Sequence, residues 1–297
     1  MKRFFKRIKH RTEYYLFISL ASVLSIMPVR TASNICSRVA RYIGPIFKVT
    51  RTARKNLRMA YKDISVEEED KIIDDLWDNF GRFAGEFPHI HKIKDICPQY
   101  VEIIGNENIE HLRESGRPFL LCTGHFANWD MALRILKYLY PKWGVVYRSA
   151  NNPMVNSVIN KWRSVDGVNL IAKGPAGVRS LVQSIKNRDS IVMLVDQKMN
   201  DGISVPFFGL PSMTAPAIAK IALDYDYEIV PVELIRSGAC NVQVVVHKPL
   251  EINRGEDGEK ETKRIMSKIN HMLEGWIRKR PGQWFWFHHR WGKHNTN

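Results

Sequence analysis

Residues 99–297 alternate between short apolar runs and longer segments whose apolar residues recur at helical spacing. The expected strands cover residues 100–105, 119–124, 144–148, 168–172, 190–196, 228–235 and 242–252, and the expected helices cover residues 108–115, 127–139, 152–165, 177–187, 215–225 and 260–280. Such an alternation is typical of a layered α/β domain, in which helices connect parallel strands. We therefore predict an α/β fold whose largely parallel sheet is flanked by helices.

The residues before this domain are expected to be helical. Residues 30–44 and 50–63 form basic helical segments, and residues 65–87 form an amphipathic helix. Ser65 and Glu68 have the spacing of a capping box at the start of that helix. We expect three parts: residues 1–30, a basic N-terminus and membrane anchor helix; residues 31–98, basic and amphipathic helices packed on the body; and residues 99–297, the α/β domain.

Positive charge is concentrated near the N-terminus. The chain has a net charge of +15, and residues 1–60 contain 14 Lys and Arg against one acid, Glu13. The remaining 237 residues therefore carry about +2. A basic N-terminal region on a nearly neutral body predicts an anionic partner, with membrane lipid and nucleic acid as the two candidates.

The residues around this charge favour a membrane. Six basic residues lie among the first eleven, and an uncharged run follows at residues 14–27 and ends at Pro28. The run is shorter than the roughly 20 residues of a membrane-spanning helix. A signal peptide fits the basic start, but no clear cleavage site follows and the next residues are strongly basic. We expect an uncleaved anchor, interfacial or a short tilted span, with cytoplasmic basic flanks; a buried core helix is the alternative.

A histidine and a carboxylate stand where an apolar run meets a helix. The sequence CTGHFANWD, residues 122–130, places His125 after the expected strand and Asp130 in the first turn of the next helix. In α/β folds, ligands bind at this edge of the sheet. A neutral imidazole is a suitable base near pH 7, and a carboxylate on its other nitrogen would fix the tautomer, so the pair suits deprotonation of a hydroxyl. The alternative is a helix-capping histidine with an ordinary first-turn acid.

Other kinds of catalytic centre have less support. GHFANWD is not a G-x-S-x-G elbow, and Cys122 at the end of an apolar strand is expected to be buried. The four cysteines have no CxxC spacing, and no familiar third metal ligand lies near His125. AKGPAG, residues 172–177, matches neither a Walker loop nor a dinucleotide fingerprint. We expect no metal, no cofactor, and direct transfer without a covalent enzyme intermediate.

Four further residues are candidates for substrate binding. Asp196 and Gln197 lie at the end of the expected strand 190–196, at the same ligand-binding edge. Arg148 ends another expected strand, and Arg163 lies late in a helix. Either arginine could hold a phosphate or an anionic carrier group, or could be a solvated surface charge.

Two aromatic stretches each have two interpretations. After Gln197 we expect a Gly/Pro/aromatic loop, with Thr214 as the N-cap of the next helix. Within this loop VPFFG, residues 205–209, could line an apolar pocket for a chain or pack on the core. RPGQWFWFHHRW, residues 280–291, could form a membrane-interface belt or core residues of a last strand. We favour core with a polar edge for the second stretch, where Arg290 could contact a phosphate.

The order of these motifs resembles the lipid A late acyltransferase family, the lauroyl and myristoyl transferases of Gram-negative bacteria, within the lysophospholipid acyltransferase superfamily. The resemblance covers nearly the whole chain. It rests on the basic N-terminus with its hydrophobic segment, and then on GHFANWD, VYRSANNP, MLVDQKMNDGISVPFFG, TAPAIAKIA, IVPVELIR and PGQWFWFHHRW in this order. H-x4-D alone is moderately specific, whereas the ordered set is strong.

The resemblance implies a mechanism and roles for the residues above. His125 would deprotonate the hydroxyl of a 3-hydroxyacyl chain on a lipid A precursor, and that oxygen would attack the thioester of an acyl carrier protein. Asp130 would orient His125. The resemblance further implies an arginine near the site and polar residues after the DQ strand, which leaves the roles of Arg148, Arg163 and Asp196 open.

The resemblance also implies the partners and the location. The acyl carrier protein is the donor, the anionic lipid A precursor is the acceptor, and the protein lies at the cytoplasmic face of the inner membrane, without nucleic acid. The basic charge would bind anionic lipid and attract the acidic carrier protein. Two alternatives remain: an acyltransferase for another lysophospholipid or glycolipid, and a non-enzymatic basic membrane-tethered binding protein.

Overall fold

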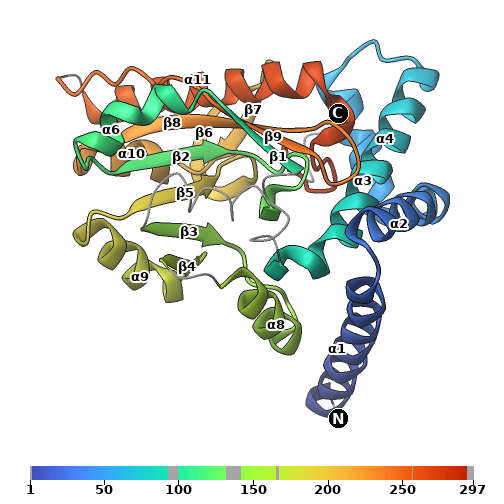
Figure 1. The fold of residues 1–297 in the computed structure, drawn as a ribbon. Coiled ribbons are helices and arrows are strands. Elements are labelled where there is room, and N and C mark those ends of the chain that lie inside the picture. Colours follow the sequence, from blue (N-terminus) through green and yellow to red (C-terminus); the bar gives the residue numbers. More distant parts are fainter. Residues whose placement is uncertain (1, 93–99, 132–141, 165–166, 256, 293–297) are drawn as a thin grey trace.

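A seven-stranded sheet forms the centre of the molecule (Figure 1). The computed structural model describes residues 2–92, 100–131, 142–164, 167–255 and 257–292. The strands are β1 (Val101–Ile104), β2 (Phe119–Thr123), β3 (Trp143–Tyr147), β4 (Val168–Ala172), β5 (Ser190–Leu194), β8 (Glu228–Arg236) and β9 (Val242–Val246), in the order β1-β9-β8-β2-β5-β3-β4. Every neighbouring pair is parallel except β8 and β9. The largely parallel sheet is therefore confirmed, and each expected strand belongs to it.

Helices flank this sheet, as predicted. They are α6 (Glu110–Glu114), α8 (Pro153–Arg163), α9 (Pro175–Lys186), α10 (Ala217–Asp224) and α11 (Gly258–Lys279). Helix α9 packs on β3, β4 and β5, and α10 packs on β2 and β8. Most of the helix expected at residues 127–139 lies outside the described residues. Within its described part, residues 129–131 are helical.

The N-terminal part is helical, with α1 (Lys2–Ile26), α2 (Val29–Ile43), α3 (Lys48–Ala60) and α4 (Val66–Glu86). The Ser65 hydroxyl accepts from the Glu68 amide and the Glu68 carboxylate accepts from the Ser65 amide, which confirms the capping box. Helices α2 and α4 pack closely because Gly81 and Gly85 have no side chain: an added Cβ would lie 2.5 Å from the Cys36 carbonyl oxygen and 2.4 Å from the Ala32 carbonyl oxygen.

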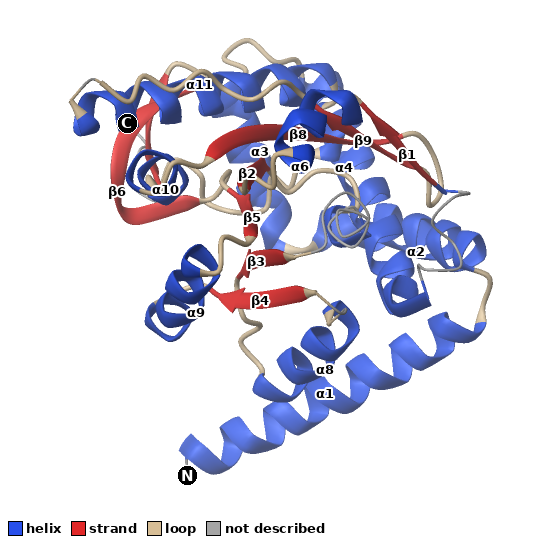
Figure 2. Cartoon of the chain, turned by 60° about the vertical axis from the view of Figure 1, so that its left-hand side comes forward, coloured by secondary structure: helices blue, strands red, loops and turns tan. Residues whose placement is uncertain are grey.

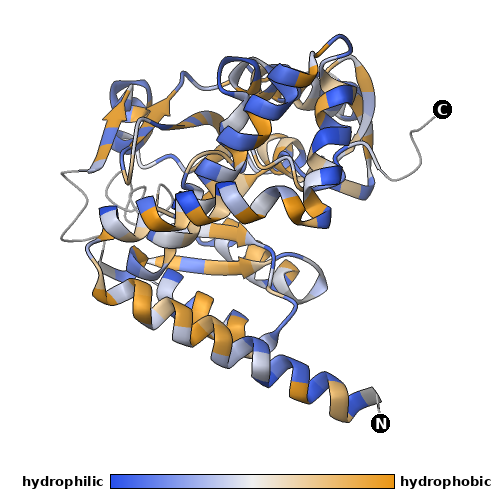
Figure 3. Cartoon of the chain, turned by 90° about the vertical axis from the view of Figure 1, so that its right-hand side faces the viewer, coloured by the Kyte–Doolittle hydropathy of each residue, from blue (hydrophilic) through white to orange (hydrophobic). Residues whose placement is uncertain are grey.

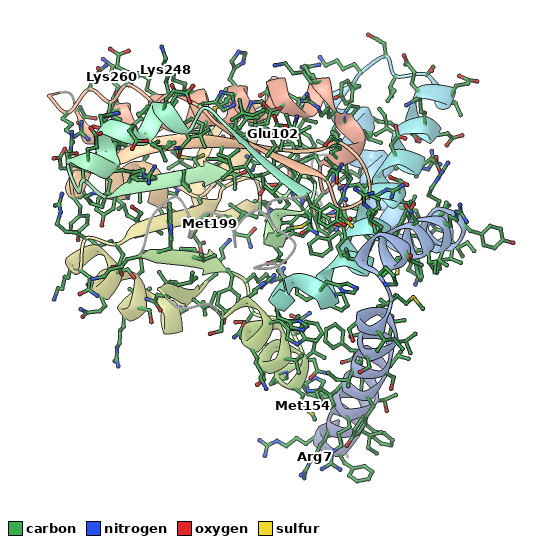
Figure 4. The ribbon with its side chains drawn as sticks, viewed as in Figure 1. Arg7, Glu102, Met154, Met199, Lys248 and Lys260 are labelled. Carbon is green, nitrogen blue, oxygen red and sulfur yellow. The ribbon has the colours of Figure 1, made fainter. Side chains whose placement is uncertain are left out.

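Helix α1 runs along α8 on one side of the molecule (Figure 2). Asn152 at the start of α8 donates to the His10 carbonyl at 2.8 Å and to the Glu13 carboxylate at 3.0 Å. Hydrophobic residues recur along α1 (Figure 3), several of them exposed, and basic Arg7 lies toward the end of α1 farthest from the sheet (Figure 4). Within the described part of the chain, no helix is both long enough and apolar enough to cross a membrane.

One segment differs from its expected structure. The stretch after Gln197 was expected to be a Gly/Pro/aromatic loop, with Thr214 capping the next helix, but it forms an antiparallel hairpin of β6 (Lys198–Phe207) and β7 (Leu210–Thr214). The connecting residues Phe208 and Gly209 have φ of 53° and 71°, as a tight two-residue hairpin turn requires. Thr214 therefore ends a strand and does not cap α10.

The aromatic residues near the C-terminus belong to the core. Trp284, Trp286 and Trp291 are buried, and the segment that holds them forms turns and a single bridge to Phe126, not the last strand considered above. Arg290 is fully buried and donates to the Thr214 hydroxyl at 2.8 Å. Its buried position rules out the phosphate contact considered for Arg290.

Candidate active site

The sheet brings His125 and Asp196 together although 71 residues separate them. Strands β2 and β5 are parallel neighbours, with Thr123 opposite Leu194 at their carboxyl ends. The Val195 amide donates to the Thr123 carbonyl at 2.9 Å, which extends this pairing past the last strand residues. The two side chains therefore leave the same edge of the sheet, which is the expected ligand-binding edge.

Asp196 holds the imidazole of His125. Its Oδ1 lies 2.7 Å from Nδ1 of His125, and its Oδ2 accepts from the His125 amide and from the Trp284 indole N–H, each at 2.8 Å. Asp196 is fully buried; burial alone would raise its pKa, but the charge and hydrogen bonds of His125 hold the pKa of this carboxyl well below its usual range. An ionised carboxylate only accepts, so in the neutral imidazole Nδ1 carries the proton and Nε2 carries the lone pair.

This geometry corrects the expected pairing of His125 with Asp130. Asp130 accepts two hydrogen bonds from Arg163, from Nε to Oδ1 and from Nη2 to Oδ2, both at 2.7 Å. The physical reason is direction: Asp130 lies one helical turn beyond His125 and faces α8, whereas Nδ1 of His125 faces the end of β5, where Asp196 lies. Asp196, predicted to bind substrate, is therefore the carboxylate that contacts Nδ1 of His125.

Asp130 and Arg163 form a separate, partly buried ion pair. Asp130 is 3% exposed, and Arg163 lies near the rings of Phe87 and Tyr147, with its guanidinium carbon 5.8 and 5.9 Å from their centroids. Burial alone would lower the pKa of Arg163. The charge and hydrogen bonds of Asp130 outweigh this effect, so the pKa of Arg163 is raised. Arg163 is thus a fixed cation beside the site and not a solvated surface charge.

The turn that carries His125 is held by the C-terminal aromatic segment. The Phe285 amide donates to the His125 carbonyl and the Ala127 amide donates to the Gln283 carbonyl, both at 3.1 Å. The Trp129 ring packs edge-on to the imidazole, with centroids 5.1 Å apart, and Phe285 packs on it from 6.1 Å. Trp284 and Phe285 were expected only as core or membrane-belt residues. No local pattern in the sequence indicates that they support the histidine.

A cavity of about 540 Å³ opens beside His125. His125, Asp130, Arg163 and Gln197 line it together with Arg148. The rest of its wall comes mainly from β3, β4, β5, α9 and α10, with apolar side chains that include Val145, Leu170, Leu181, Val195 and Ile218. The cavity therefore has one polar end at the sheet edge and an apolar body between the sheet and the helices.

The structure brings all six predicted site residues to this cavity or to its histidine. Arg148 is exposed at the end of β3, and the Gln197 amide nitrogen lies 3.4 Å from Nε2 of His125. Residues 205–209 do not line the cavity; Phe207 and Phe208 pack in the core instead.

A metal centre and a cysteine nucleophile both lack support among the described residues near His125. They contain no group of three or more His, Cys, Asp or Glu side chains that could hold a metal ion. Cys122 is fully buried, and burial raises the pKa of its thiol far above the ordinary value. An imidazole with a fixed tautomer beside an apolar cavity can accept a proton from a hydroxyl that enters the polar end.

Comparisons with known proteins agree with this class of chemistry. Residues 1–293 match the family described as bacterial lipid A biosynthesis acyltransferase, so the chain belongs to this family and is an acyltransferase. It is 21% identical over 277 residues to the lipid A biosynthesis acyltransferase of Haemophilus influenzae, which covers 92% of this chain and 85% of that protein. It is 22% identical over 259 residues to the lipid A biosynthesis palmitoleoyltransferase of Escherichia coli, which covers 86% of this chain and 82% of that protein.

Proposed function

We propose that this acyltransferase moves a fatty acyl chain from an acyl carrier protein to the hydroxyl of a 3-hydroxyacyl chain on a lipid A precursor. The observation that carries the proposal is the position of His125. Its Nδ1 is held by Asp196, and the residue lines the polar end of an apolar cavity of about 540 Å³. A hydroxyl on an acyl chain and a thioester of another acyl chain both suit such a boundary between polar and apolar surroundings.

The steps follow from the tautomer of His125. Nε2 takes the proton of the acceptor hydroxyl as its oxygen attacks the thioester carbonyl carbon. The tetrahedral intermediate breaks its C–S bond, and the imidazolium returns the proton to the leaving thiolate. Asp196 stabilises the imidazolium between these steps because its buried negative charge lies 2.7 Å from Nδ1. The products are an ester and a free thiol, without a covalent enzyme intermediate.

The other residues of the polar end bind the reacting groups. Asp130 fixes Arg163 at the cavity wall through two hydrogen bonds, and the guanidinium offers charge to the oxygen that develops on the thioester carbonyl. Arg148 is exposed and binds an anionic phosphate of the acceptor. Gln197 lies beside Nε2 of His125 and orients the acceptor hydroxyl.

Helix α1 is proposed to lie on the cytoplasmic face of the inner membrane of a Gram-negative bacterium. Its exposed apolar residues include Phe4, Phe5, Leu16 and Leu20, and its first turns are strongly basic. Replacing Phe4→Ser and Phe5→Ser, both 64% exposed, removes apolar surface without touching the core. We expect weaker flotation with anionic lipid vesicles; unchanged flotation would contradict this placement.

The function is tested with purified protein, acyl carrier protein loaded with chains of different length, and a hydroxyacylated lipid A precursor. We expect the precursor to gain the mass of one acyl chain, and an equal amount of carrier protein to appear as free thiol. Lysophospholipid and glycolipid acceptors run in parallel. If one of these gains the chain and the lipid A precursor does not, the proposed acceptor is wrong; if none is acylated, the proposed reaction is wrong.

A further inference from the structure

A second buried carboxylate, Glu86, contacts the turn of residues 125–128, which we call the active-site turn. Its Oε1 accepts from Ser33 Oγ at 2.8 Å, Arg236 Nη1 at 2.6 Å and the Cys240 amide at 3.1 Å, and its Oε2 accepts from Asn128 Nδ2 at 2.6 Å and Arg236 Nη2 at 3.0 Å. Burial raises the pKa of Glu86, but the charge and hydrogen bonds of Arg236 outweigh it and leave the pKa below its ordinary value. Glu86 is therefore an ionised group with five donors.

One of these donors belongs to the turn between the two site residues. Asn128 is 2% exposed, and its side-chain oxygen accepts from the Met131 amide at 3.0 Å, where the helix that contains Asp130 begins. The Asn128 amide group thus has its nitrogen on Glu86 and its oxygen on the helix start. Ala127, directly before Asn128, has φ of 47°, a left-handed conformation that costs energy for a residue with a side chain.

The partner of Glu86 holds the other side of the same turn. The Arg236 amide donates to the Gln283 side-chain oxygen at 2.8 Å, and the Gln283 side-chain nitrogen donates to the Arg236 carbonyl at 2.9 Å. The Gln283 carbonyl accepts from the Ala127 amide at 3.1 Å. Glu86 and Arg236 therefore reach residues 127 and 128 by two routes, one through Asn128 and one through Gln283.

We propose that Glu86, through Asn128, is a positioning residue that holds the turn so that His125 and Asp130 both face the cavity. The inference rests on the proposed function for its kinetic readout. The strained conformation at Ala127 persists because neighbouring contacts fix it. The hydrogen bond from Asn128 to Glu86 ties the turn to α4 at 2.6 Å, beside the stacking of Trp129 on Phe83 of the same helix. If this contact is lost, the turn relaxes and the base moves away from the reacting hydroxyl, although the base itself is intact.

The test compares Glu86→Gln with a matched control, Glu69→Gln. Glu69 is also a buried acid on α4, and its carboxylate pairs with Arg54 and Arg58 at 2.6 Å, away from Asn128 and Gln283. We expect Glu86→Gln to lower kcat roughly 10- to 100-fold with little change in KM, the effect of a misplaced catalytic group. Glu69→Gln should keep the wild-type kcat even where it lowers the melting temperature.

A rescue experiment separates positioning from general stability. In Glu86→Gln, the new side-chain amide nitrogen can face the Asn128 amide nitrogen. Both groups are donors, so no hydrogen bond forms between them. Adding Asn128→Asp reverses the hydrogen bond between the two side chains, keeps one carboxylate in the cluster, and still provides an oxygen for the Met131 amide. We expect the double variant to recover at least tenfold in kcat over either single variant. A double variant no better than the singles would overturn the proposal.

Two measurements keep the test decisive. If Glu86→Gln does not fold, Asn128→Ala leaves the Glu86–Arg236 pair in place and must show the same loss of kcat; wild-type kcat in either variant overturns the proposal. Amide hydrogen exchange over residues 119–131 needs no substrate and should be faster in Glu86→Gln than in Glu69→Gln. Equal exchange in these two variants refutes the positioning role, whereas absent acyl transfer by the wild-type protein refutes the function alone.

Discussion

The active-site turn has two ends, and at each end a buried carboxylate holds a partner of a different kind. At one end, Asp196 faces a histidine, a backbone amide and an indole N–H. At the other end, Asp130 faces the guanidinium of Arg163, with which it shares two hydrogen bonds. The first pair leaves Nε2 of His125 facing Gln197 at the cavity, 3.4 Å from its amide nitrogen, and the second fixes a permanent cation on the cavity wall.

This difference shows what the H-x4-D spacing does in this fold. The spacing places the two residues on opposite ends of one polar cavity wall and does not join them. His125 obtains its carboxylate from the neighbouring strand, and Asp130 obtains its cation from α8. We therefore expect substitutions at the histidine end to remove proton transfer. Substitutions at the arginine end should weaken the stabilisation of the negative charge that develops on the thioester oxygen.

The largest effect is expected for His125→Ala. The substitution removes the proton acceptor, and the described residues place no second base in contact with Asp196 on the cavity side. Turnover should fall by about 10²- to 10⁴-fold. His271→Ala, at an exposed position of α11, is the matched control. A folded His125→Ala protein with near-normal turnover would contradict the proposed mechanism.

A smaller effect is expected at the arginine end, for Asp130→Asn. Loss of this carboxylate removes the partner of a partly buried arginine, so kcat/KM should fall by roughly 10- to 100-fold, as for a charged hydrogen bond. Asp78→Asn breaks another arginine pair, with Arg82, away from this cavity and serves as control. Wild-type kcat/KM in Asp130→Asn would contradict the role proposed for the Asp130–Arg163 pair.

Much of this site follows from the sequence, because short apolar runs determine where strands end. The runs at residues 119–124 and 190–196 placed His125 and Asp196 at strand ends without any knowledge of the sheet. Their pairing could not be predicted in that way, because it depends on β5 lying beside β2 while β3 and β4 lie farther out. The hairpin after Gln197 was missed for a local reason: its turn is Phe208-Gly209, not one of the usual Asn-Gly or Asp-Gly pairs.

The last effect concerns stability and not turnover, at the histidine end. His288 is partly exposed and lies near Asp196, His125 and Arg290; desolvation lowers its pKa to about 4, although Asp196 opposes the shift. The unfolded chain therefore binds this proton first, so stability is fully present above about pH 6.5 and falls as the pH drops toward 4, by at most on the order of 3 kcal/mol.

Replacing His288→Phe removes the titrating group while keeping a ring in the core. Urea midpoints at pH 7 and pH 5 should differ less in this variant than in the wild-type protein. Equal differences in both proteins would show that His288 does not contribute to acid sensitivity.

The central claim is that Asp196, and not Asp130, sets the tautomer of His125. The direct measurement is the nitrogen NMR spectrum of histidine-labelled protein near neutral pH, with His125→Ala to assign the signals. The wild-type protein and Asp130→Asn should both show His125 protonated on Nδ1, whereas Asp196→Asn should lose this preference and gain the Nε2–H form. Loss of the Nδ1–H form in Asp130→Asn, with the wild-type spectrum retained in Asp196→Asn, would contradict the account.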